Sequence, residues 1–164
     1  MPTILEITDG TTTVNLLNIG TGFHLTDWTP RIVGLKSGGI YQDSDIAPGR
    51  QLAFGVHGTA NEVFNLNVSG QRQNELIKQT QDLLRMLEKA RNYWLTRWQD
   101  TPVYLKAQSS CETNIRYALI HNYQFDHLDN PYAQPFFTAS DIVAMDGLSL
   151  GIERGHWLGS VPGT

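Results

Sequence analysis

Apolar and polar residues alternate with two different periods along this chain, and the change between them separates strands from a helix. In the first seventy residues apolar positions recur every second residue, most clearly in Phe23 to Trp28 and in Glu62 to Val68. The second segment places Phe64, Leu66 and Val68 on one face and asparagines on the other. A period of two is that of a half-buried β-strand, so both segments are predicted strands.

Between residues 72 and 98 the apolar side chains recur every three or four residues, the period of an amphipathic helix. Ser69 is the predicted N-cap, because its hydroxyl can accept a hydrogen bond from a free N–H of the first turn. Pro102 ends the helix at the latest, although an end near Trp94 would leave Trp98 in a turn. The predicted helix covers one face of a sheet. Its apolar face carries Leu76, Ile77, Thr80, Leu83, Leu84, Leu87, Ala90, Trp94 and Trp98.

Two Asp-Gly pairs adjoin strand-like segments, and Asp-Gly supplies the positive φ values of a tight hairpin turn. Asp9-Gly10 follows the apolar run Ile4 to Ile7, and Asp146-Gly147 precedes the apolar run Leu148 to Glu153. The sequence therefore predicts a β-hairpin at each pair.

Further strands are predicted at residues 31–36, 51–54, 103–108 and 116–125, all outside the helix. The resulting order of strands, one helix and strands predicts an α+β fold that is mainly β. We expect an antiparallel β-sandwich or split barrel with the long helix packed on a sheet. Residues 1–158 form one predicted domain, and residues 159–164 read as a linker-like tail that leads to a further domain.

Composition narrows the classes of function. The chain has 164 residues, of which 17% are charged, and a formal net charge of −4. This charge gives no reason to expect a nucleic-acid partner. No run approaches the ~20 apolar residues of a membrane span, and the first residues lack the basic and apolar regions of a signal peptide. We expect neither a membrane partner nor secretion.

The sequence gives little support for a nucleophile or a metal site. Cys111 is the only cysteine, and a free structural thiol is favoured over a nucleophile because no cysteine-enzyme signature surrounds it. The five histidines show no zinc-ligand spacing. His121 and His127 could converge with Asp126 or Asp129, but ordinary strand and loop histidines are the favoured interpretation.

Two other motifs also favour structural interpretations. Asp43-Ser44-Asp45 begins like a calcium-binding loop, but Pro48 and Phe54 stand where such a loop needs Gly and Glu. Aromatic residues around the end of the helix, Trp94 and Trp98 among them, could stack a sugar or a base. They are instead predicted to anchor the helix in the core. No catalytic, cofactor-binding or metal-binding residue is predicted.

The order of segments resembles the N-terminal domain of distal tail proteins of long-tailed bacteriophages and related tail-tip structural proteins. The segments that carry the resemblance span nearly the whole chain. They are Trp28-Thr29-Pro30, Gly49-Arg50, Glu62 to Gly70, Leu83 to Ala90, Pro102 to Leu105, Arg116-Tyr117-Ala118, and Leu148 to Arg154 with Trp157.

The resemblance implies a structural virion protein that is made in the host cytoplasm and forms a ring, commonly a hexamer. Such a ring joins the tail tube to the baseplate or tip and contacts other tail proteins. Two loop-like stretches, Tyr41 to Arg50 and Asp126 to Phe137, are long enough to reach a neighbouring subunit, and one of them is expected to pack across the interface. The candidate interface residues are Tyr41, Asp43, Asp45, Arg50, Asp126, Tyr132, Phe136 and Phe137.

Two alternatives remain at this stage. A free-standing β-sandwich module that binds carbohydrate or protein would show a concave face lined by Trp or Tyr with carboxylates nearby. A small enzyme would need titratable groups that converge in a pocket. Mass measurement in solution distinguishes a ring from both.

Overall fold

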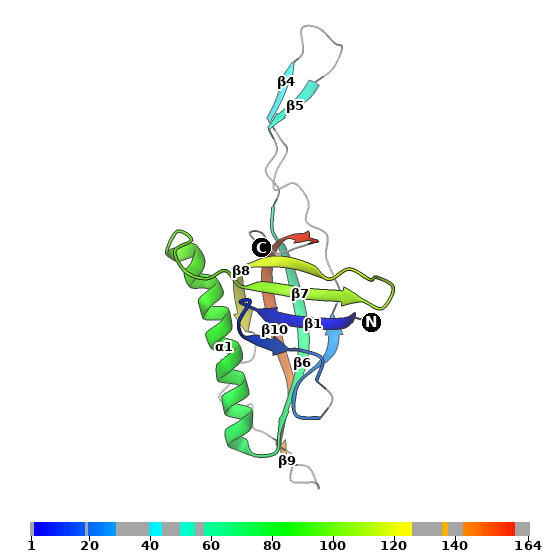
Figure 1. Ribbon diagram of the computed structural model, residues 1–164, viewed down its shortest axis with the longest axis vertical. Helices are drawn as coiled ribbons and strands as arrows, with labels where there is room; N and C mark the ends of the chain where they lie inside the picture. The colour runs from blue at the N-terminus through cyan, green and yellow to red at the C-terminus, as the bar shows by residue number, and fades with distance from the viewer. Residues whose placement is uncertain are drawn as a thin grey trace.

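The computed structural model describes residues 2–18, 20–28, 40–43, 50–54, 58–125, 136–137 and 143–159. Eight of the strands form one antiparallel sheet, and two form a separate hairpin (Figure 1). The elements are β1 (Pro2–Thr8), β2 (Thr13–Asn15), β3 (Gly22–Trp28), β4 (Ile40–Asp43), β5 (Arg50–Phe54), β6 (Ala60–Gly70), α1 (Gln73–Leu95), β7 (Tyr104–Ser109), β8 (Arg116–Phe125), β9 (Phe136–Phe137) and β10 (Val143–Leu158).

The large sheet curls into a nearly closed barrel. Its strand order is β2-β1-β7-β8-β10-β6-β3, with β9 paired to β10, so β2 and β3 are the two ends of the path. These ends meet again where Leu17 bridges His24, and the Asn18 N–H donates to the Phe23 carbonyl at 2.9 Å. The predicted class, an α+β fold that is mainly antiparallel β with one helix, is confirmed.

The core lies between α1 and the concave face of the sheet. Phe64, Leu66 and Val68 of β6 are fully buried, as their alternation predicts. The helix contributes Leu76, Leu83, Met86, Leu87 and Ala90.

A polar contact also joins the helix to β8. The Tyr123 hydroxyl donates to Glu88 of α1. Burial and this hydrogen bond together raise the pKa of Tyr123 to about 12.

The helix begins and ends inside the predicted limits. Ser69 is not its N-cap, because β6 continues to Gly70 and the Ser69 hydroxyl donates to the Gly20 carbonyl at 2.5 Å. Arg72 occupies the N-cap position without a side-chain hydrogen bond. At the other end the helix stops at Leu95, and Trp98 lies in the turn that follows.

The second Asp-Gly pair does not form a hairpin. Val143–Leu158 is one continuous 16-residue strand that pairs with β6 on both sides of the pair. The register shifts between Met145 and Leu148, and Gly147 has a φ of 77°. Asp-Gly therefore supplies the positive φ of a β-bulge here, because the long neighbouring strand keeps both halves in one ladder.

The first Asp-Gly pair forms the predicted hairpin, with β1 and β2 paired on either side and Gly10 at a φ of 88°. The stretch from residue 41 to 50, predicted as a loop, instead begins and ends in strand: β4 and β5 pair across it. The predicted strand at residues 31–36 and the tail at residues 160–164 lie outside the described residues.

Candidate functional site

A groove of about 990 Å³ opens where the barrel fails to close. It lies between β3 on one side and the start of β1 and end of β7 on the other, and we call it the seam groove. Its apolar lining consists of Pro2, Leu17, Leu25, Trp28, Ala107 and Trp157.

Both strands that border the seam groove contain a register shift in the ladder with their paired neighbour. The register of β1 against β7 shifts between Pro2 and Ile4, and that of β3 against β6 shifts between Leu25 and Asp27. Pro2 also lacks an N–H to donate. Bulged edges are poor templates for a further ladder, so the seam stays open beyond the Leu17–His24 bridge.

A buried ion pair holds the two tryptophans of the groove. Glu62 of β6 and Arg154 of β10 have no solvent exposure, and the Arg154 Nε donates to Glu62 Oε1 at 2.7 Å. The Trp28 Nε1 donates to Glu62 Oε2 at 2.6 Å. The Arg154 guanidinium lies 4.4 Å above the ring centre of Trp157, a cation–π distance. One charged pair therefore contacts both aromatic side chains.

The polar rim of the seam groove carries no free cation among the residues that line it. Arg116 makes two hydrogen bonds to the Glu112 carboxylate, at 2.6 and 2.9 Å, and this interaction raises the pKa of Arg116. The Gln108 amide nitrogen donates to the carbonyls of Glu112 and Thr113, and among the described residues no hydrogen bond to the Gln108 side-chain oxygen is found. Asp27 is an exposed carboxylate on β3.

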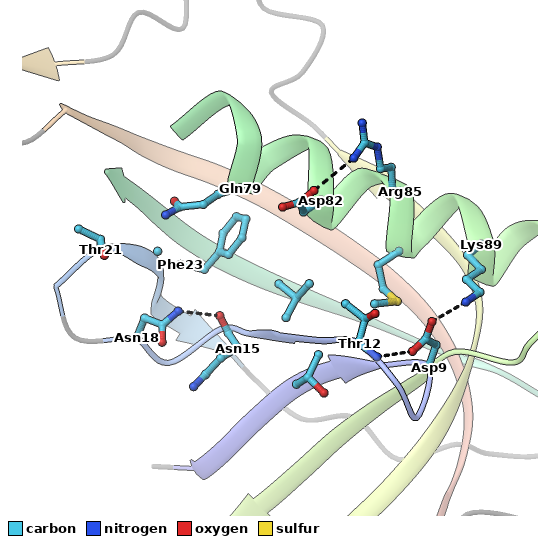
Figure 2. Close-up of a pocket in the computed structure, with 14 residues that line it drawn as sticks. Asp9, Thr12, Asn15, Asn18, Thr21, Phe23, Gln79, Asp82, Arg85 and Lys89 are labelled. Atoms are coloured by element: carbon cyan, nitrogen blue, oxygen red, sulfur yellow. Dashed lines mark hydrogen bonds and ion pairs between the residues drawn. The ribbon is translucent and has the colours of Figure 1, made fainter. Parts of the chain in front are cut away.

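A second hollow, of about 520 Å³, lies between α1 and the connections around β2, and we call it the helix cleft. Figure 2 shows Lys89 of the helix reaching Asp9 of the first hairpin turn. Burial would raise the pKa of Asp9. The hydrogen bonds from Lys89 and from the N–H groups of Thr12 and Thr11 outweigh this effect and lower the pKa to about 2.

The helix cleft also contains an unsatisfied acceptor. The buried Gln79 Oε1 has no hydrogen-bond partner. Asp82 and Arg85 on the rim form only a 3.4 Å contact with each other.

The two tryptophans at the end of α1 have different surroundings: Trp94 packs on the sheet, and Trp98 is exposed. Trp94 is the predicted anchor: its Nε1 donates to the Ile120 carbonyl at 3.0 Å, and its ring stacks on His121 at 4.1 Å. Trp98 is 65% exposed, so its predicted place in the core is wrong. The helix ends three residues earlier, and φ values of 53° at Arg97 and 69° at Trp98 turn the chain outward.

The predicted interface residues do not form one described cluster. Tyr41 and Asp43 lie in β4, and Arg50 begins β5. Phe136 and Phe137 form β9, which pairs with Ala144 and Val143 of β10. The structure does not describe Asp45, Asp126 or Tyr132. It also does not describe His127 and Asp129, two of the possible metal ligands named from the sequence.

Cys111 is exposed in the turn between β7 and β8. Among the described residues, no three His, Cys, Asp or Glu side chains lie close enough together to hold a metal ion.

Sequence reasoning missed the Glu62–Arg154 pair and the groove it supports. One signal was present, since the alternation of β6 places Glu62 on the same face as Phe64 and Leu66. A carboxylate on a buried face requires a partner. Its partner is 92 residues away and was not identifiable from spacing.

No protein-family model matches the chain, and comparison with curated proteins finds no match either. Within the described residues, the structure contains no helix that is both long and apolar enough to cross a membrane.

Proposed function

We propose that this protein is a structural subunit of the tail of a long-tailed bacteriophage. Copies of the chain form a ring, in the hexameric form common in such tails, where the tail tube meets the baseplate or tip. Its role consists of contacts with neighbouring copies and other tail proteins, without catalysis. The order of segments along the chain, which resembles distal tail proteins, is the sequence support for this proposal.

The observation that carries the proposal is the separate hairpin of β4 and β5. These strands pair with each other and belong to a different sheet from the other eight. Figure 1 shows them apart from the large sheet, near the top of the view. An isolated two-stranded hairpin is marginally stable in water. A neighbouring copy would supply the missing surface, and Tyr41, Asp43 and Arg50 would lie at that contact.

Exposed apolar side chains at the end of α1 add support. Leu95 is 71% exposed and Trp98 is 65% exposed. The positive φ values of Arg97 and Trp98 are unusual for residues other than glycine and cost free energy. A strained turn that presents a tryptophan to solvent suits a surface that a second protein covers.

The mass of the protein in solution tests the proposal. We expect light scattering to report a multiple of the 18.4 kDa chain that persists on dilution. Replacing residues 40–54 with a short Gly-Ser linker should give a folded monomer. As a matched control, the same linker in place of residues 110–114, the turn between β7 and β8, should leave the assembly intact. An unaltered chain that is a monomer at every concentration would contradict the proposal.

A further inference from the structure

The seam groove has the size and chemistry of a ligand site that ring assembly does not require. Its volume of about 990 Å³ lies at the upper end of the roughly 300–1,000 Å³ typical of small-molecule sites. Trp28 of β3 and Trp157 of β10 lie on strands that flank β6 on either side. Glu62 of β6 lies between them and, with Arg154, contacts both rings.

Glu62 and Arg154 are buried beneath the two tryptophans, and removing two charges from water costs free energy that their attraction only partly or barely offsets. Replacing a buried ion pair by well-packed apolar residues is often neutral or stabilising. Net stability alone is therefore a weak reason for such a pair, whereas here it contacts Trp28 through a hydrogen bond and Trp157 through the guanidinium and so fixes both rings. Fixed aromatic side chains on the wall of a groove are suited to stacking against a ligand.

The shape of the edges argues against an extended peptide as the ligand. Strand addition needs a regular edge with free N–H and C=O groups. Both strands that border the groove carry a register shift near it, β1 against β7 between Pro2 and Ile4, and β3 against β6 between Leu25 and Asp27. Recognition by side chains, rather than by a backbone ladder, fits this geometry.

The charges argue against an anion, and the polar rim argues against a purely apolar molecule. Arg116 is already held by Glu112, and Asp27 adds a negative charge. An apolar ligand would remove water from Asp27 and from the Gln108 oxygen without replacing their hydrogen bonds, which costs free energy. A ligand with an apolar face and a hydroxylated edge satisfies both parts of the lining.

We propose that the seam groove binds a neutral oligosaccharide. The C–H faces of the sugar rings stack on Trp28 and Trp157, and sugar hydroxyls donate to Asp27 and to the Gln108 oxygen. Glu62 and Arg154 are positioning residues that hold the tryptophans. Binding is non-covalent and independent of ring formation.

The test titrates the full chain with neutral hexasaccharides of glucose, mannose and N-acetylglucosamine, and follows tryptophan fluorescence and heat. We expect at least one of them to bind with a Kd below about 1 mM. Trp157→Ala and Trp28→Phe should each weaken that binding about tenfold or more. Asp27 is exposed, so Asp27→Ala keeps the fold and should weaken binding as well. Trp98→Ala, which alters an exposed tryptophan outside the groove, should leave the affinity unchanged.

Three outcomes would overturn the proposal. These are no binding of any neutral hexasaccharide at about 10 mM, tighter binding of a sulfated oligosaccharide or an extended peptide, and binding that survives the groove substitutions but not Trp98→Ala. The mass measurement keeps this test separate from the proposed function. A monomer that binds sugar would contradict ring assembly alone, and a ring that binds none would contradict the saccharide site alone.

Discussion

The indole nitrogen of Trp28 donates a 2.6 Å hydrogen bond to Glu62, a carboxylate without solvent exposure. Arg154, equally buried, makes the ion pair with Glu62 from the neighbouring strand. A buried pair is sensitive to the loss of one member, because the remaining charge then lacks compensation. Removing one charge should therefore cost more stability than removing both, and single and double variants can measure the difference.

Glu62→Gln should lower the free energy of unfolding by about 3 kcal/mol, because it removes the carboxylate charge that pairs with the buried Arg154 guanidinium. The double variant Glu62→Leu/Arg154→Met removes both charges and should recover most of that loss. Urea denaturation of both variants measures the difference. A double variant that is less stable than Glu62→Gln would show that the pair contributes more than positioning.

Asp9 should make the free energy of unfolding decrease at acidic pH. Its pKa is about 2 in the folded state and 3.8 in the reference state, so its contribution is present above pH 4 and is lost as the pH falls toward 2. Asp9→Asn should cost about 1–2 kcal/mol at pH 7, a value reduced for solvent screening at the exposed Lys89. The cost should nearly vanish at pH 2.

Urea denaturation at pH 7 and pH 2 measures the effect of Asp9→Asn. The control is Asp82→Asn, at a half-exposed carboxylate with a 3.4 Å contact to Arg85. It should change stability by no more than about 0.5 kcal/mol. An Asp9→Asn cost that is equal at both pH values would refute the assignment.

Gly147→Ala tests the bulge in β10. Gly147 has a φ of 77°, and an added Cβ would meet no atom within 4 Å, so only backbone strain opposes the change. We expect a loss of about 1 kcal/mol in thermal or urea unfolding. Gly159→Ala is the matched control, because that position is equally open and its φ is not in the left-handed region. Equal effects at both positions would exclude strain at the bulge as the cause.

His121 should weaken the fold as the pH falls below neutrality. Burial lowers the pKa of His121, and the nearby Glu153 only partly opposes this effect. The unfolded chain therefore binds a proton more readily, so stability decreases as the pH falls through about 6.5. His121→Gln should reduce the drop in Tm between pH 7.5 and pH 5.5, whereas His24→Gln, at an exposed position, should retain it. A drop of the same size in His121→Gln would contradict this explanation.

Elements with strong local patterns were predictable. The alternation in β6 and the helical period of α1 each place apolar side chains on one face, and burial of that face is the main driving force for both elements. Asp9-Gly10 also behaves as predicted, because the side chain and backbone of Asp9 close the turn locally through Thr11 and Thr12. Patterns of this kind require no knowledge of distant neighbours.

Other features depended on which strands become neighbours. The same Asp-Gly dipeptide forms a turn at Gly10 and a bulge at Gly147, and the difference is the long strand β6 beside the second pair. Trp94 and Trp98 share one face of the expected helix, but only Trp94 reaches a carbonyl of β8 before the chain turns away.

The sequence by itself determined the kinds of element, their order and the mainly antiparallel β class, because period and turn chemistry act over a few residues. The tertiary structure alone decided that Glu62 meets Arg154, that their contact holds Trp28 and Trp157, and that the barrel stays open at the seam. Those relationships join residues that are far apart in the chain, and they follow from strand order and register, which local sequence patterns do not encode.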